Sequence, residues 1–212
     1  MYDFSKVIEQ SRPFIAVEEI LASFKSIVRL KQGRVGQRFY LEQSDKRMCF
    51  LLYNGTCIAK RTHDSLVLST IKSPSIVGLQ DVFHAKSDVH LLAMGDIEYG
   101  MMTIDEFFFY AESNNLWKNI SYMLMLSATR FSEYQREMVG ISNYELICNL
   151  LTSLSNENFE IRATTTALEY IQERSLLSRS GIMKTLSSLK AGGYILIKNG
   201  ILIKINSLPK KF

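Results

Sequence analysis

The sequence predicts an α+β fold with three consecutive parts: a β-roll of the jelly-roll type with flanking helices over residues 1–112, one long helix over 113–140, and a small module over 141–212. Short β-rich runs separated by turn residues lie between about residues 26 and 99, which is typical of a sandwich or barrel. A long segment with an apolar stripe follows, and the chain ends in a helix, a turn, a helix and a hairpin.

Size and composition are those of an ordinary globular protein. The chain has 212 residues, of which 47% are apolar and 22% charged, enough for one large or two small domains. No apolar run approaches ~20 residues and the first residues lack a signal-peptide pattern, so we expect a cytoplasmic protein without a membrane partner. The cysteines Cys49, Cys57 and Cys148 are odd in number and form no C-x-x-C pair, so no disulfide, metal site or other cofactor is expected.

The N-terminal part begins with a predicted helix. Val17, Ile20, Leu21 and Phe24 form an apolar stripe within residues 1–30. The clearest predicted strands follow it: Ser26–Leu30, Arg38–Leu41, Met48–Tyr53, Thr56–Lys60, Leu66–Ile71 and His90–Met94. The pair Asn54-Gly55 predicts a two-residue hairpin, because Asn-Gly favours the backbone of such a turn.

The long helix carries a near-heptad pattern. Thr103 and Glu106 form a capping box ahead of it, and Ser113-Asn-Asn115 caps its start. Apolar residues then recur at intervals of four and three, as in a coiled-coil seam. We therefore expect a homodimer through Leu116, Ile120, Met123, Phe131, Tyr134 and Met138. The alternative is a helix packed on its own domain.

The C-terminal module has the order of a winged helix-turn-helix. Thr166 and Glu169 form a capping box for a first helix ending near Arg174, and Ser178 is a good N-cap for a second. Gly192-Gly193 ends the second helix. Two β-rich runs joined by Asn199-Gly200, the preferred pair of a type I′ turn, complete the module.

One face of the second helix is polar and basic, and the charge of the chain is uneven. Ile182, Leu186 and Leu189 fall on the opposite, apolar face. From Arg174 onward there are 8 Lys or Arg and no Asp or Glu, whereas the first 173 residues hold 17 basic and 21 acidic side chains. A basic module on a mildly acidic body predicts binding to double-stranded DNA. The expected DNA-binding residues are Thr166, Ser178, Arg179, Ser180, Lys184, Ser187 and Lys198.

The order of these parts resembles the Crp/Fnr transcriptional regulators, most sharply at 144–151 and from Ser178-Arg179 through Gly193-Tyr194-Ile195. The resemblance implies a cyclic-nucleotide-binding-like β-roll, a dimerisation helix, an inverted-repeat operator and RNA polymerase as a partner. It also implies that Arg179, Ser180 and Lys184 read the major groove. Because the family usually has Glu where Ser180 stands, we expect a different operator. The chain is also similar to the enterobacterial branch named for inhibiting hydrogen peroxide resistance, which implies a role in oxidative stress.

Departures from the family argue against its known ligands. A cyclic-nucleotide pocket in this fold needs Gly-Glu-Leu and then Arg-Ser, where the sequence has Gly78-Leu79-Gln80 and Ser87-Asp88. Leu79 cannot accept a hydrogen bond from a ribose, and Asp88 would repel a phosphate. We therefore expect no response to cyclic AMP. The iron–sulfur branch needs clustered N-terminal cysteines, and no histidine has the context of a haem ligand, so the effector stays unnamed.

The alternatives to DNA-binding regulation are an enzyme, a protein-binding scaffold and a thiol-based redox sensor. No H-x-H metal pair, G-x-S-x-G, P-loop, H-E-x-x-H or G-x-G-x-x-G motif is present, so we expect no enzyme. A dimeric protein-binding scaffold could use the acidic and aromatic stretch between Asp96 and Tyr110. A thiol-based redox sensor regulator could use Cys49 and Cys57, if they face each other across the Asn54-Gly55 turn. Salt-dependent affinity for DNA separates the regulator from the scaffold.

Overall fold

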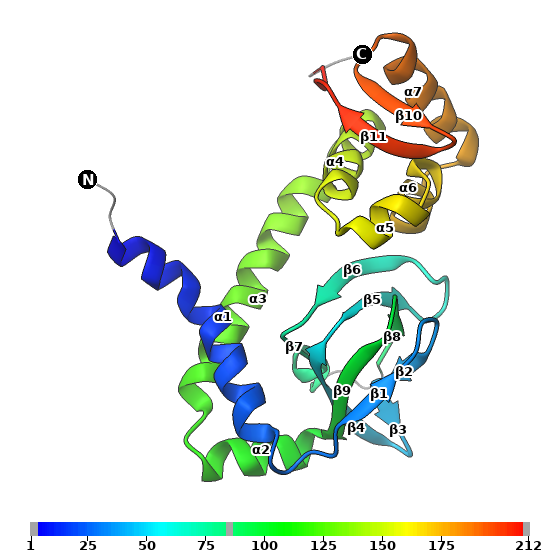
Figure 1. Ribbon diagram of the computed structural model, residues 1–212. Helices are drawn as coiled ribbons and strands as arrows, with labels where there is room; N and C mark the ends of the chain where they lie inside the picture. The colour runs from blue at the N-terminus through cyan, green and yellow to red at the C-terminus, as the bar shows by residue number, and fades with distance from the viewer. Residues whose placement is uncertain (1–3, 84–86, 210–212) are drawn as a thin grey trace. The chain divides into compact units, whose positions relative to one another are not determined.

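A computed structural model gives the fold (Figure 1) and describes residues 4–83 and 87–209, with the backbone alone for 4–11, 81, 137, 138 and 160. The chain divides into two compact units, Met1–Arg130 and Phe131–Phe212. The first unit comprises α1 (Phe4–Phe24), β1 (Lys31–Gly33), β2 (Arg38–Tyr40), β3 (Glu42–Gln43), β4 (Lys46–Asn54), β5 (Thr56–Arg61), β6 (Val67–Lys72), β7 (Ser75–Val77), η1 (Leu79–Asp81), β8 (Val89–Ala93), β9 (Ile97–Thr103), α2 (Ile104–Ser113) and most of α3 (Trp117–Met138).

The strands of the first unit form a β-roll of two sheets. Within the described residues, β1, β9, β4 and β3 make one sheet in that order, with β7 also paired to β4. The second sheet has the order β2-β8-β5-β6. The pairs are antiparallel, and the inward-facing residues of the two sheets meet in an inter-sheet core that includes Phe39, Phe50, Leu91 and Tyr99. This confirms the predicted roll.

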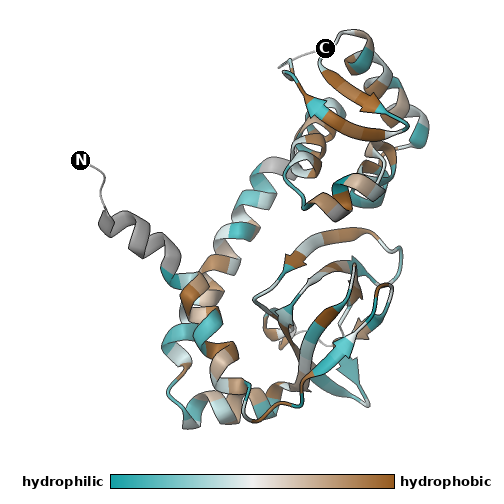
Figure 2. Cartoon of the chain, viewed as in Figure 1, coloured by the Kyte–Doolittle hydropathy of each residue, from teal (hydrophilic) through white to brown (hydrophobic). Residues whose placement is uncertain are grey.

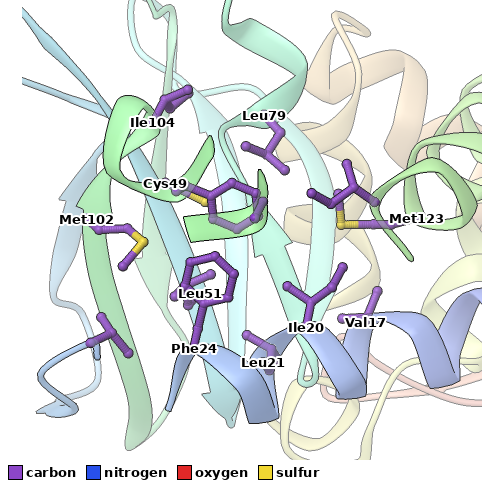
Figure 3. Close-up of a cluster of buried hydrophobic side chains, with 14 residues drawn as sticks. Val17, Ile20, Leu21, Phe24, Cys49, Leu51, Leu79, Met102, Ile104 and Met123 are labelled. Atoms are coloured by element: carbon purple, nitrogen blue, oxygen red, sulfur yellow. The ribbon is translucent and has the colours of Figure 1, made fainter. Parts of the chain in front are cut away.

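Strand β4 is apolar on both of its faces. Phe50 and Leu52 point into the inter-sheet core, and the alternating residues Cys49 and Leu51 point to the other side of the sheet. On that side they meet α1, α2 and α3 in a second cluster, the helix-side core, shown in Figure 3. The run from Met48 to Tyr53 is therefore continuously apolar, because β4 lies between two cores.

The helix-side core joins the helices to the roll. Phe24 of α1 stacks on Phe107 of α2 with ring centroids 4.6 Å apart, and both rings are fully buried. Ile20 and Leu21 extend this contact along α1, and Met123 adds a residue from α3 (Figure 3). The predicted stripe of the first helix is thus confirmed, because its four apolar residues are all buried here.

Two local predictions in the roll were wrong. Residues 26–30 form no strand, because the end of α1 continues into a turn in which the Val28 amide donates to the Phe24 carbonyl and β1 begins only at Lys31. Asn54-Gly55 does not close a hairpin between paired strands, because β4 and β5 belong to different sheets. Gly55 carries the chain between the sheets, and a Cβ there would lie 2.7 Å from Ile97.

The second unit is the predicted winged helix-turn-helix. After the end of α3 it contains α4 (Asn143–Ser155), α5 (Phe159–Thr164), α6 (Ala167–Arg174), α7 (Arg179–Ala191), β10 (Ile195–Lys198) and β11 (Ile201–Ile205). Its core comes from the apolar faces of α4, α6 and α7 and from the wing strands β10 and β11. The two wing strands are largely coloured as hydrophobic in Figure 2. Both central residues of the wing turn, Asn199 and Gly200, have positive φ, as the type I′ prediction requires. In the described residues, no helix is long and apolar enough to cross a membrane.

Candidate nucleic-acid interface

The second helix of the helix-turn-helix, α7, presents the predicted reading face. The Ser178 hydroxyl accepts a hydrogen bond from the Gly181 amide at 3.2 Å and so fixes the start of the helix. Ile182 and Leu189 are fully buried and Leu186 nearly so, which anchors one face of α7 in the core. The opposite face is therefore turned to solvent, with exposed Arg179, Ser180, Lys184 and Ser187.

The wing is fastened to the start of α6. The Gly200 carbonyl accepts from the Ala167 amide at 2.9 Å, and a Cβ on Gly200 would lie 2.8 Å from Cγ2 of Thr166. This contact fixes the wing turn against the start of α6, and the exposed Lys198 lies next to that turn. Thr166 itself is engaged in capping: its hydroxyl donates to the Glu169 carboxylate at 2.8 Å and accepts from the Glu169 amide at 3.2 Å. Contact of Thr166 with DNA stays a prediction.

Glu169 is an acidic neighbour of the reading face that the sequence patterns did not reveal. Hydrogen bonds from the Thr166 hydroxyl and amide lower the pKa of Glu169, and the positive charge of Arg179 lowers it further. The capped carboxylate is thus ionised at neutral pH and lies within electrostatic reach of Arg179. Its negative charge therefore attracts the guanidinium at the start of α7.

A groove of about 410 Å³ runs between α4 and α7. Residues of α4, among them Asn143, Tyr144 and Ile147, form one wall, and Ser178, Gly181 and Lys184 belong to the other. The sequence patterns identified the α7 residues but missed the α4 wall. The capping box of Ser142 and Glu145 fixes where α4 starts, but it cannot show which helix faces it.

The predicted dimer seam is partly occupied by the chain's own core. Ile120 and Met123 are 2% and 6% exposed and belong to the helix-side core, which Leu116 also contacts. The reason is α1, which runs beside the first half of α3 (Figure 1) and bonds to it through Glu19 and Asn119 at 2.6 Å. Ile120 and Met123 are therefore not available to a second chain. The side chain of Met138 lies outside the described residues.

Another stripe of α3 is exposed. Trp117, Leu124 and Phe131 are spaced seven residues apart and are 41%, 43% and 61% exposed. Ser121 and Ala128, also exposed, lie between them at heptad positions. Trp117, Ser121 and Leu124 of this stripe each come one position after Leu116, Ile120 and Met123 of the predicted seam. Phe131 and Tyr134 both belong to the predicted set, and both are exposed, at 61% and 43%.

Cys49 and Cys57 do not form a thiol pair. Cys49 points into the helix-side core and Cys57 into the inter-sheet core, and both are fully buried. Burial raises the pKa of Cys49 well above its usual range and that of Cys57 to about 12. Since the thiolate is the reactive form, these two cysteines are poor redox sensors.

The positions that correspond to a cyclic-nucleotide pocket make other contacts within the chain. Leu79 is 7% exposed and packs in the helix-side core (Figure 3). Asp88 lies 3.3 Å from the Nδ1 atom of His63, and the Ser87 amide donates to Glu42 at 3.2 Å. His84 lies outside the described residues. In the described ranges, no three His, Cys, Asp or Glu residues come together as metal ligands.

The acidic and aromatic stretch is divided between core and surface. Phe107 is buried and the Tyr110 hydroxyl donates to the Ser23 carbonyl at 3.0 Å, so both serve the fold. Phe109 is 77% exposed, and Asp105 and Glu106 stay in solvent.

Comparison with known proteins agrees with this geometry. Residues 143–210 match the family described as winged helix-turn-helix DNA binding. A global regulator from Xanthomonas campestris described as responsive to cyclic di-GMP superposes with a TM-score of 0.70 at 14% identity, covering 90% of this chain and 100% of that one. A CRP/FNR-family transcriptional regulator from Thermus thermophilus superposes with a TM-score of 0.61 at 13% identity, over 85% and 94%. The chain has the fold of the Crp/Fnr regulators.

Curated proteins similar to this chain are described as inhibitors of hydrogen peroxide resistance. "Inhibitor of hydrogen peroxide resistance" from Escherichia coli K12 is 28% identical over 165 residues, 77% of this chain and 79% of the relative. The protein of that name from Salmonella typhimurium is 26% identical over 151 residues, 70% and 72% of the two chains. The predicted resemblance, to the family and to this branch, is therefore confirmed.

Proposed function

We propose that the chain is a homodimeric transcriptional regulator that binds an inverted-repeat operator, acts without cyclic AMP and takes part in the cellular response to peroxide. The observation that carries the proposal is the exposed face of α7, with its cations and hydroxyls, on a module without acidic residues from Arg174 onward. The names of the curated relatives support the link to peroxide. In the cytoplasm, RNA polymerase is the partner that we propose for a regulator that activates transcription.

The groups on α7 suit the major groove. Arg179, in the first turn, can donate two hydrogen bonds to one guanine, which distinguishes that base from the other three. Lys184, one turn further, can contact a base or a phosphate, and Ser180 and Ser187 can donate to either. Lys198, beside the wing turn, can contact phosphates and so add affinity without sequence preference.

The exposed stripe of α3 supports the dimer. Two copies of Trp117, Leu124 and Phe131 would bury large apolar side chains that otherwise remain in water. A two-fold dimer would present two α7 helices to successive major grooves roughly 34 Å apart. The preferred site should then be an inverted repeat with half-site centres about 10 base pairs, or a multiple of that, apart.

Paired titrations test the reading role of α7. A duplex selected from random DNA and a scrambled duplex are each titrated at several salt concentrations. We expect Arg179→Ala to cost on the order of 1–3 kcal/mol per contact on the selected duplex and to relax preference at one base. The matched control is Lys198→Ala, which should weaken both duplexes alike and reduce the salt slope by about one unit. Equal weakening of both duplexes by Arg179→Ala would mean that α7 is not the reading helix.

A further inference from the structure

The helix-side core of the first unit is closely packed. Cys49, Leu79 and Met123 come from a strand, a short turn of helix and α3, and meet in the helix-side core with 0%, 7% and 6% exposure (Figure 3). A ligand seated there would have to displace well-packed apolar side chains. The groove between α4 and α7 is different, because it is open and borders residues proposed to read DNA.

The groove has an apolar floor and a polar rim. Ile147 is 1% exposed and forms the floor with the half-buried Leu177. Ser178, Lys184 and Ser188 are exposed at the rim. All residues that line the groove are described, and none of them is acidic. Its volume of about 410 Å³ lies within the range of small-molecule sites.

Local structure keeps this groove open. Gly181 occupies the first turn of α7, where glycine lowers helix stability by ~1 kcal/mol relative to alanine, and a Cβ there would lie 3.2 Å from the Ser178 hydroxyl and narrow the groove. Across the groove, the Tyr144 hydroxyl donates to the Pro209 carbonyl at 2.7 Å. Burial raises the pKa of Tyr144, so this wall is uncharged as well as fixed.

We propose that the α4–α7 groove is an effector site for a small carboxylate with an apolar body, and that its occupation opposes DNA binding. The apolar body would cover Ile147 and Leu177, and the carboxylate would pair with the Lys184 ammonium and accept from the hydroxyls of Ser178 and Ser188. The absence of acidic lining groups and the basic character of the module favour an anion over a cation or a neutral ligand.

The opposition to DNA follows from shared residues and rests on the proposed function. Ser178 and Lys184 line the groove and also belong to the proposed reading face of α7. A carboxylate on Lys184 neutralises the charge that a phosphate or a guanine would otherwise meet. The two ligands should therefore compete, and at a concentration ten times its own Kd the effector should raise the apparent Kd for DNA about 11-fold.

The test uses 2-naphthoate as the probe and the full-length chain. Binding is first followed without DNA, through amide chemical shifts. We expect changes at Ile147, Gly181 and Thr185 and none in the roll. The uncharged analogue 2-naphthylmethanol should bind at least tenfold more weakly. DNA is then titrated with and without saturating 2-naphthoate, which should raise the apparent Kd for DNA.

Two variants separate the groove from the rest of the module. Ser188→Phe places a ring in the groove from the third turn of α7, away from Arg179, and should lower 2-naphthoate affinity at least tenfold while DNA affinity without the probe stays unchanged. Gln172→Phe adds the same ring to the exposed side of α6, outside the groove, and should leave probe binding intact. Circular dichroism of both variants checks that they fold.

Several results would overturn the proposal. The groove would not be the binding site if amide chemical shifts changed in the roll, or if none changed up to the solubility limit of 2-naphthoate. Binding in the groove without any change in DNA affinity would remove the regulatory role. If Ser188→Phe bound DNA more weakly and the wild-type chain bound no 2-naphthoate, the groove would be a contact surface for the DNA backbone and not an effector site. Because probe binding is measured without DNA, failure of the wild-type chain to bind DNA would contradict the proposed function and leave the site assignment standing.

Discussion

At the scale of single residues, His90 has an unusual environment. It lies on β8 between Tyr40 of β2 and Lys60 of β5, on the outer face of their sheet. The side chain is 5% exposed, and its Nδ1 atom has no hydrogen-bond partner among the described residues. Burial lowers the pKa of His90 below its ordinary value of 6.5, and the positive charges of Arg38 and Lys60 lower it further. The imidazole is therefore neutral in the folded chain at neutral pH.

This predicts a loss of stability in mild acid. Above about pH 6.5 His90 is neutral in both states and has no effect. As the pH falls below that value, the unfolded chain takes up a proton that the folded chain resists, so the free energy of unfolding falls until the pH reaches the lower, folded pKa. His90→Gln should flatten this part of the profile in urea denaturation at a series of pH values. Replacing the exposed His63 instead should leave the acid loss in place, and an unchanged slope for His90→Gln would contradict the argument.

At the scale of elements, the wing depends on one close contact. Gly200 has φ +83° and would carry a Cβ only 2.8 Å from Thr166, whereas Gly193, with φ +71°, has nothing within 4 Å of the same position. Replacing either glycine with alanine should lower the free energy of unfolding by roughly 1–2 kcal/mol, because alanine is strained in the left-handed backbone conformation. Gly200→Ala should lower the free energy of unfolding further, because its Cβ also pushes the wing away from α6. Urea denaturation of the two variants measures the difference, and equal losses would show that the wing contact contributes nothing.

The exposed stripe of α3 gives a prediction about assembly. Leu124→Glu together with Phe131→Glu places charges in the proposed seam, and we expect sedimentation to show monomers. The matched control is Lys118→Glu with Arg136→Glu, which changes charge on the exposed helix outside the Trp117–Leu124–Phe131 stripe and should leave the dimer intact. A dimer that survives the first pair of changes would exclude this seam.

Elements set by local chemistry were predicted well from the sequence. The capping boxes at Thr103 and Thr166 and the N-cap at Ser178 all start helices where expected, because each depends on residues at most three positions apart. The face of α7 followed from the spacing of its buried residues. The fold class, the wing turn and the polar side of α7 could therefore be predicted without coordinates.

Features that depend on distant segments could not be predicted. The stripe that contains Ile120 has the apolar pattern of a dimer seam. In the structure it is covered by α1, which lies about a hundred residues earlier in the chain (Figure 1). Asn54-Gly55 has the chemistry of a hairpin, but β4 and β5 pair with different partners. The α4 wall of the groove was missed for the same reason, because helix spacing does not reveal which helix lies opposite.

At the scale of the whole molecule, the filled helix-side core predicts how the regulator responds to cyclic AMP. Leu79 occupies the position where a ribose partner is required, and it is packed against other apolar side chains. We expect calorimetry with cyclic AMP to show no binding at micromolar concentrations and the affinity for operator DNA to be unchanged. One binding site per chain with micromolar affinity would contradict the packing argument.

Strand β4 has a consequence for how the first unit comes apart. Since Leu51 faces the helix-side core and Leu52 the inter-sheet core, neither core can lose its packing without disturbing the strand that the other one needs. The roll and the helices covering it should thus open as a single cooperative unit. In hydrogen–deuterium exchange, the amides of Leu51 and Leu52 should share one opening free energy, equal to that for global unfolding of the unit, even though their side chains face opposite sides of the sheet.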